Sequence, residues 1–200
     1  GRAPWRSAAA VCWELDRDCP IDVPDPIVRT AWERRVNSPQ SSAAGRLFDA
    51  ASAIILGVGE TSFEGQGPMW LEAIARDPAA FPRLELRSTV EGRLELDWAP
   101  LVDWLLQAAP TSAAGWADCA GAVHASLADG IVQIADRLRA LSGSSVVGLT
   151  GGVFQNRRLT EAALAGLSDR GFDVLLPVQL PCNDGGLSYG QVADFIGRKV

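Results

Sequence analysis

Hydrophobic residues return every three or four positions over much of the chain, and this spacing predicts a largely helical first part. The clearest case is 115–141, which predicts one long amphipathic helix. The same spacing, interrupted by prolines and glycines, predicts five further helices, at 7–15, 26–36, 41–57, 64–75 and 100–107. Apolar and polar residues alternate on both sides of Glu91–Gly92, which predicts a β-hairpin.

From about residue 145 the pattern changes, and short apolar runs alternate with helical spacing. The run 145–150 predicts a short buried strand and 172–176 a second strand, with a helix over 156–170 between them and a closing helix to about Gly197. This order is typical of an α/β fold, a central sheet flanked by helices. Ligands of such folds bind at the carboxyl ends of the strands, where two Gly-rich turns fall here.

The composition is that of a folded protein. Of the 200 residues, 48% are hydrophobic and 21% charged, which excludes disorder over the whole length and suits one domain or one lobe. The net charge of −6 argues against a nucleic-acid partner, because phosphate backbones require clustered positive charge. The apolar runs are shorter than the roughly 20 residues that span a bilayer, and no signal peptide is evident. We therefore expect a cytoplasmic protein with no membrane contact.

Few residues could serve as metal ligands or nucleophiles. The four cysteines form no Cys-x-x-Cys pair, which argues against a zinc site and favours free thiols. The single histidine, His124, lies beside the apolar stripe of the long predicted helix. We interpret it as a half-buried residue with a hydrogen-bond partner, and a ligand contact is the alternative. A Ser-His-Asp centre is not supported, since no Gly-x-Ser-x-Gly motif accompanies it.

Two Gly-rich turns are candidates for chemistry. In the first, Gly151 and Gly152 let the backbone approach a flat or anionic ligand, and the helix that begins near Asn156 offers free N–H groups. In the second, Asp184 precedes a helix and could ligate a divalent cation such as magnesium. Simpler interpretations stay open, namely packing for the glycines and an N-cap role for Asp184.

A third candidate is the segment 41–49, where serine and glycine precede an amphipathic helix. Ser42 and Gly45 could contact phosphate, with Arg46 as the charge partner. Alternatively, Ser41–Ser42 only caps the helix, and Arg46 forms a surface ion pair with Asp49.

Taken together, these segments resemble the C-terminal end of HypF-type carbamoyltransferases, maturation factors that begin the synthesis of the cyanide ligands of nickel–iron hydrogenases. The resemblance rests on five matches in the family's order over nearly the whole chain. They are Pro4-Trp5-Arg6, the segment 41–49, which matches the family's Ser-Gly-Arg-Leu-Phe-Asp segment, Phe63-Glu64-Gly65-Gln66, the Val123-His124 step, and the Gly-rich segments 151–156 and 181–191.

The resemblance implies the second lobe of the family's Kae1-like domain, which has an actin-like ATPase (ribonuclease H-like) fold. On that basis residues 1–200 form a single lobe, with a Pro- and Trp-rich helical segment at 1–40 and a nucleotide-binding α/β part at 41–200. The first lobe and the family's upstream domains have no counterpart in the sequence, so we expect a C-terminal fragment, natural or engineered.

The resemblance also implies an ATP-dependent carbamoyl transfer. Carbamoyl phosphate is hydrolysed, the carbamate is adenylated to carbamoyl adenylate, and the carbamoyl group passes to the C-terminal cysteine of the partner HypE. A divalent metal, magnesium or iron, would assist. The implied site residues are Gly151, Gly152 and Asn156 at the adenosine, Ser42 and Gly45 at the phosphates with Arg46 nearby, and Asp184 at the metal.

Two other interpretations stay open. A tRNA threonylcarbamoyl-transfer protein or an O-carbamoyltransferase shares this lobe, although the Gly-Arg-Leu-Phe-Asp segment favours HypF. Alternatively, the chain alone is a non-catalytic docking lobe, because a nucleotide held from one side lacks the closed, water-poor site that catalysis requires. The missing first lobe is itself an expected partner, and the face that it would cover could support a homodimer.

Overall fold

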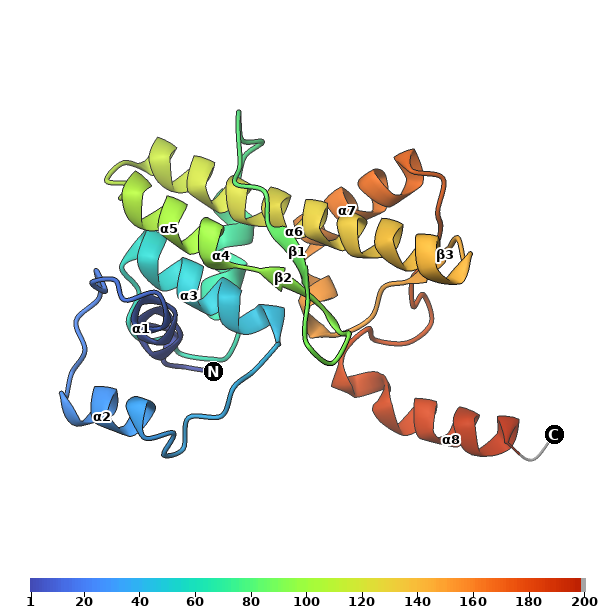
Figure 1. The fold of residues 1–200 in the computed structure, drawn as a ribbon, viewed down its shortest axis with the longest axis horizontal. Coiled ribbons are helices and arrows are strands. Elements are labelled where there is room, and N and C mark those ends of the chain that lie inside the picture. Colours follow the sequence, from blue (N-terminus) through green and yellow to red (C-terminus); the bar gives the residue numbers. More distant parts are fainter. Residues whose placement is uncertain (199–200) are drawn as a thin grey trace.

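The computed structural model describes residues 1–198 and shows a mainly helical molecule with two small sheets (Figure 1). The α-helices are α1 (Pro4–Glu14), α2 (Ile27–Glu33), α3 (Ala44–Leu56), α4 (Gln66–Ile74), α5 (Ala99–Ala108), α6 (Ala113–Ser142), α7 (Arg157–Asp169) and α8 (Leu187–Gly197). The strands are β1 (Glu85–Ser88), β2 (Leu94–Asp97), β3 (Val146–Gly148) and β4 (Asp173–Leu175), and the short 3-10 helices are η1 (Gly152–Gln155) and η2 (Asp184–Gly186). Every predicted helix and strand is present, with ends shifted by a few residues.

The long helix α6 organises the core. It packs against α3, α4 and α5 on one side of the molecule in Figure 1 and against α7 on the other. Apolar side chains from these helices meet there and are at most 1% exposed, among them Phe48, Leu71, Leu105, Val123 and Leu159. Burying one such side chain stabilises the fold by about 1.5–3 kcal/mol. No helix among the described residues combines the length and apolar character needed to cross a membrane.

The two sheets have different roles. β1 and β2 form the predicted antiparallel hairpin, and the Gln133 side chain of α6 donates a 3.0 Å hydrogen bond to the Leu84 carbonyl at its base. β3 and β4 pair in parallel with Val147 opposite Val174, and α7 connects them. This strand–helix–strand unit confirms the α/β arrangement, and it places the carboxyl ends of both strands at one edge.

Two local expectations are wrong. α3 begins after Ala43, and no side chain caps it; Ser41 Oγ instead accepts the Ala43 N–H at 3.2 Å in a tight turn before the helix. β3 is not buried, because Val146 is 54% exposed while Val147 points inward. Among the described residues β3 has only β4 beside it, and alternate side chains of a strand point to opposite faces, so one face stays open.

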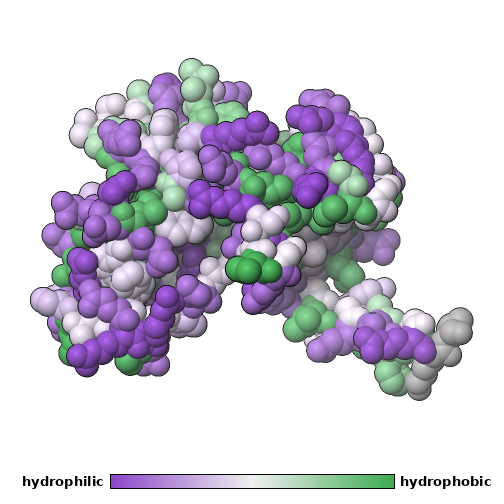
Figure 2. Space-filling view, viewed as in Figure 1, coloured by the Kyte–Doolittle hydropathy of each residue, from purple (hydrophilic) through white to green (hydrophobic). Residues whose placement is uncertain are grey.

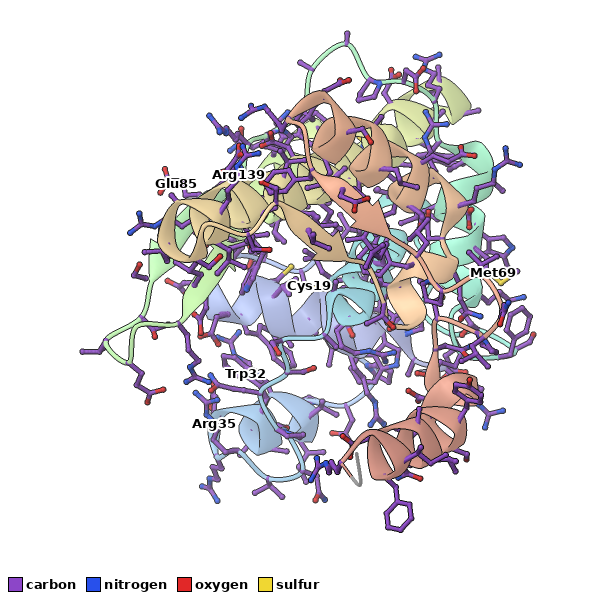
Figure 3. All side chains as sticks on the ribbon, turned by 90° about the vertical axis from the view of Figure 1, so that its right-hand side faces the viewer. Cys19, Trp32, Arg35, Met69, Glu85 and Arg139 are labelled. Carbon is purple, nitrogen blue, oxygen red and sulfur yellow. The ribbon has the colours of Figure 1, made fainter. Side chains whose placement is uncertain are left out.

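Two helices lie at the periphery. α2 has no buried residue and is held to α1 through Trp32, whose ring lies 5.5 Å from that of Trp13 (Figure 3). α8 projects from the body with η2 as its main contact (Figure 1), and it carries exposed apolar side chains such as Leu187, Tyr189 and Val192. Green surface marks part of this apolar face in Figure 2. α8 therefore presents exposed apolar surface, while the patch expected on the face toward the first lobe, and its use in a homodimer, stay predictions.

Candidate functional site

The two Gly-rich turns lie against each other at the carboxyl ends of β3 and β4. The Gly151 N–H donates a 2.6 Å hydrogen bond to the Cys182 carbonyl, and the Thr150 hydroxyl donates to the same oxygen at 3.3 Å. A Cβ on Gly152 would lie 3.9 Å from the Cβ of Asn183. We call residues 150–153 and 182–186 together the turn pair. The parallel strands bring together two segments that are thirty positions apart in the sequence.

The first turn needs glycine at one position for its backbone. Gly151 has φ 111° and ψ 156°, a conformation that side-chain-bearing residues avoid. This conformation turns the chain directly into η1. Within residues 1–198, the N–H groups of Gly152 and Val153 donate to no other residue. Two donors are therefore left for a ligand at the exposed side of the turn.

Gly151→Ala is expected to lower the free energy of unfolding by about 2 kcal/mol, because alanine cannot hold this φ without strain. Gly148→Ala is the matched control: it lies three residues earlier, with ordinary φ and open space around a Cβ. Urea unfolding of both variants checks the expectation. Equal stabilities would show that the turn relaxes into another conformation without cost.

Asp184 is exposed at the start of η2 and has no ion pair among the described residues. The N-cap interpretation of Asp184 is wrong, because the neighbouring Asn183 accepts the Gly185 N–H at 3.0 Å and caps the turn. The carboxylate of Asp184 is thus not used by the local fold. However, residues 1–198 hold no group of three His, Cys, Asp or Glu side chains that could bind a metal. Asp184 can supply one oxygen ligand, but the described residues do not form a metal site by themselves.

Asn156 is buried behind the turn pair and uses both ends of its side-chain amide. Its oxygen accepts the Leu159 N–H at 2.9 Å and so caps α7. Its nitrogen donates to His124 Nε2 at 2.8 Å, while His124 Nδ1 donates to the Ala120 carbonyl at 2.7 Å. The amide therefore positions the turn relative to α6, and a contact between Asn156 and adenosine stays a prediction.

His124 is 1% exposed, so the expectation of a half-buried histidine is wrong and that of a hydrogen-bonded one is confirmed. Burial lowers its pKa below the usual 6.5, and the positive charge of Arg158 acts in the same direction. Its ring also packs 5.1 Å from that of Phe48 on α3. His124 is therefore a neutral link between α3, α6 and the start of α7.

α3 contacts η1, so the third candidate segment, at the start of α3, lies on an element that neighbours the turn pair. Ser42 is exposed, and a Cβ on Gly45 would meet no atom within 4 Å. Both positions are thus open to a ligand. The Arg46 guanidinium instead pairs with two carboxylates, Glu64 at 2.9 Å and Asp49 at 3.0 Å. Within residues 1–198 it forms no ion pair or hydrogen bond with the turn pair.

The pair of Arg46 with Asp49 is not the surface ion pair expected from the sequence. The side chain of Asp49 is only 3% exposed, and its Oδ2 lies at ion-pair distance from Arg46 without accepting a hydrogen bond. Burial raises the pKa of Asp49, and the charge of Arg46 opposes this rise. A spacing of three residues on a helix predicts the pair but cannot reveal that α1 and α4 cover the carboxylate side of α3.

Sequence reasoning also missed the part that Cys182 and Asn183 play. Cys182 acts through its backbone carbonyl, and its thiol is free, as are those of the other three cysteines. Any residue type could supply this backbone carbonyl, so the sequence could not predict the contact. Residue type does favour Asn183 as an N-cap. It favours the neighbouring Asp184 equally, so the sequence could not distinguish the two.

Three comparisons with known proteins identify the same family. A family model described as "Carbamoyltransferase, Kae1-like Domain, second subdomain" matches residues 1–191. The chain is 37% identical to a carbamoyltransferase HypF homolog of Cupriavidus necator, over 95% of this chain and 52% of the relative. It is 39% identical to carbamoyltransferase HypF of Rhodobacter capsulatus, over 94% of this chain and 25% of the relative. The chain thus spans from a quarter to about half of these relatives' lengths.

Solved structures extend the comparison to the fold. Full-length HypF in a phosphate- and nucleotide-bound form superposes with a TM-score of 0.83 at 26% identity, over 98% of this chain and 27% of that one. T. kodakarensis HypF superposes with a TM-score of 0.73 at 21% identity and the same coverage, which shows the shared fold alone. The expected Kae1-like α/β lobe is confirmed.

Proposed function

The chain belongs to the HypF carbamoyltransferase family, as the second subdomain of its Kae1-like domain, and from this premise we propose that it forms one wall of a nucleotide-dependent carbamoyl-transfer site. The carbamoyl group would come from carbamoyl phosphate, pass through carbamoyl adenylate at the expense of ATP, and reach the C-terminal cysteine thiol of a HypE-type partner. The acceptor thiol belongs to that partner, so no cysteine of this chain needs to act as a nucleophile.

The observation that carries the proposal is the turn pair. Its glycines leave the backbone open, and the free N–H groups of Gly152 and Val153 are donors for a nucleotide. Gly45 and Ser42, at the start of α3, lie on the neighbouring element and would face the phosphates. Donors that are fixed before the ligand arrives stabilise the charge that collects on phosphate oxygens during adenylation.

A divalent metal, magnesium or iron, would neutralise phosphate charge when it is bound. Asp184 would contribute a single carboxylate oxygen to it, and the remaining ligands would be waters, phosphate oxygens and groups outside the described residues. The role of Asp184 would therefore be to place one negative charge within the turn pair. The first subdomain of the Kae1-like domain would close the other side of the nucleotide and exclude water.

Calorimetric titration of ATP tests this proposal. We expect the chain to bind ATP weakly, and about tenfold more tightly with magnesium, since one carboxylate joins metal and protein. Asp184→Ala should remove the gain from magnesium and leave the weaker metal-free binding. Asp22→Ala is the matched control, an exposed aspartate without an ion pair in the loop before α2.

Two results would contradict the proposal. Equal magnesium dependence in Asp184→Ala and the unmodified chain would remove Asp184 from the site. Formation of carbamoyl adenylate by the chain alone would contradict the view that it is only one wall of the site, because electrostatic stabilisation requires a closed pocket.

A further inference from the structure

The start of α1 borders a cavity of about 690 Å³ that shares no lining residue with the turn pair. Its volume lies within the range of small-molecule sites. The polar side chains around it are Arg2, Arg6, Ser7, Asn37, Arg46, Glu60 and Thr61. Its lining includes Gly1, at the N-terminus that Figure 1 marks. Three guanidinium groups therefore line the cavity together with the Glu60 carboxylate, in a protein whose net charge is −6, and one of the three, Arg46, is paired with Asp49 and Glu64.

Two arginines of this cavity, Arg2 and Arg6, are not neutralised by a carboxylate of the described residues. Twelve of the seventeen arginines form ion pairs with carboxylates. Within residues 1–198, Arg2 and Arg6 pair with no carboxylate, and the side chains of Ser7 and Asn37 form no hydrogen bond. Glu60 lines the same cavity and pairs with neither arginine. The donors at this cavity are thus available to an external acceptor.

The backbone around the cavity is fixed. The Trp5 N–H donates to the Gly59 carbonyl at 3.3 Å, and the Thr61 N–H donates to the Arg2 carbonyl at 3.0 Å. The guanidinium of Arg6 lies over the ring of Trp5, 5.3 Å from its centre, and Trp5 is itself 6% exposed. Stacking on a buried ring restricts the Arg6 side chain, which lowers the entropy cost of binding.

Two carboxylates hold the side chain of Arg46. Asp49, beneath it, is 3% exposed, and Glu64 holds the other side of its guanidinium at 2.9 Å. These two carboxylates orient Arg46 at the cavity wall, although they also neutralise part of its charge. Arg2 and Arg6 retain their full charge, and a guanidinium matches the oxygens of phosphate in a planar fork.

We propose that this cavity is a second anion site, which binds the phosphate group of a small molecule through Arg2, Arg6 and Arg46. It shares no lining residue with the turn pair, and Arg46 is the one cavity residue that the resemblance also places near the nucleotide phosphates. Ser7 and Asn37 complete the donor set, and the cavity leaves room for an organic group attached to the phosphate. Inorganic phosphate and a phosphate monoester share the chemistry that the site recognises.

Titration of inorganic phosphate and of glycerol phosphate, with calorimetric detection, tests the site. We expect both to bind, and Arg6→Gln and Arg2→Gln each to weaken binding at least about tenfold, because each removes a charge-assisted hydrogen bond. Arg137→Gln is the matched control, because Arg137 is exposed on α6 without an ion pair and lies outside the cavity. It should bind like the unmodified chain. Tighter binding of glycerol phosphate would favour a phosphorylated small molecule over free phosphate.

Several outcomes would overturn the proposal. They are no binding of either probe, an equal loss in Arg137→Gln, or binding of acetate as tight as that of phosphate. The α-amino group of Gly1 also borders the cavity, so the chain acetylated at its N-terminus must retain binding. Circular dichroism of Arg6→Gln and Arg2→Gln establishes that both variants fold, and unchanged binding in two folded variants would also overturn the assignment.

Discussion

Asn156→Ala is expected to lower the free energy of unfolding by about 2–4 kcal/mol. Loss of an N-cap costs about 1 kcal/mol, and the buried His124 Nε2, left without its donor, costs about 1–3 kcal/mol more. Both contributions arise from one side chain that is 9% exposed. Urea unfolding measures the sum. A loss near 1 kcal/mol would show that only the cap matters.

Ser112→Ala is the matched control for the cap alone. The Ser112 hydroxyl accepts the Gly115 N–H at 3.2 Å at the start of α6 and has no second buried partner. We expect it to cost about 1 kcal/mol. The difference between the two variants then isolates the contribution of the hydrogen bond to His124.

Asn156→Asp should change how the free energy of unfolding depends on pH through the same contact. In the unmodified protein the pKa of His124 is lowered, so the unfolded chain binds more protons and stability falls as pH drops below about 6.5. An aspartate can only accept, and it would favour a protonated His124 Nε2 and raise that pKa. The stabilising contribution of the ion pair between His124 and the aspartate should then be present at acid pH. It should be lost as pH rises through the raised pKa of His124. The sign of the stability change with pH should therefore reverse.

Gly121→Ala is expected to cost about 3 kcal/mol, even though alanine favours a helix interior by about 1 kcal/mol. A Cβ at this buried position of α6 would overlap the Arg76 carbonyl oxygen and lie 3.1 Å from its carbon. That carbonyl is backbone, and the Arg76 N–H bonds to Ala117 on the same helix, so the loop after α4 cannot move away cheaply. Thermal unfolding should shift downward by roughly 6–12 °C.

Gly190→Ala is the matched control, since Gly190 is inside α8 and a Cβ there would meet no atom within 4 Å. We expect it to be neutral or to stabilise by up to about 1 kcal/mol. A Gly121→Ala variant as stable as the unmodified chain would mean that the loop at Arg76 does not press on α6.

The sequence predicted most of the fold because each element has a local cause. Periodic apolar positions predicted α6 and α3, and alternation about Glu91–Gly92 predicted the hairpin. The general rule for strand ends in α/β folds predicted where the two Gly-rich turns lie. The bond between Gly151 and Cys182 was out of reach, because it joins two backbone groups whose residue types do not matter.

Burial was harder to predict than position. Arg46 and Asp49 have the spacing of a surface ion pair, yet packing of α1 and α4 around α3 covers Asp49. His124 lies beside the apolar stripe of α6, and Phe48 of α3 and Asn156, which caps α7, enclose it. The error at Asp184 has a different origin, because a shift of one residue decides whether Asn183 or Asp184 caps the turn. Such shifts depend on backbone angles that the residue pattern does not determine.

The continuity of α6 limits how this protein can move. It is one helix of 30 residues, about 45 Å at 1.5 Å per residue, and it contacts both α3 and α7. The His124 link fixes α3 to the start of α7 across it. The start of α3 and the first turn of the turn pair therefore move together as a rigid body. Any hinge that opens or closes around a ligand must lie outside this body.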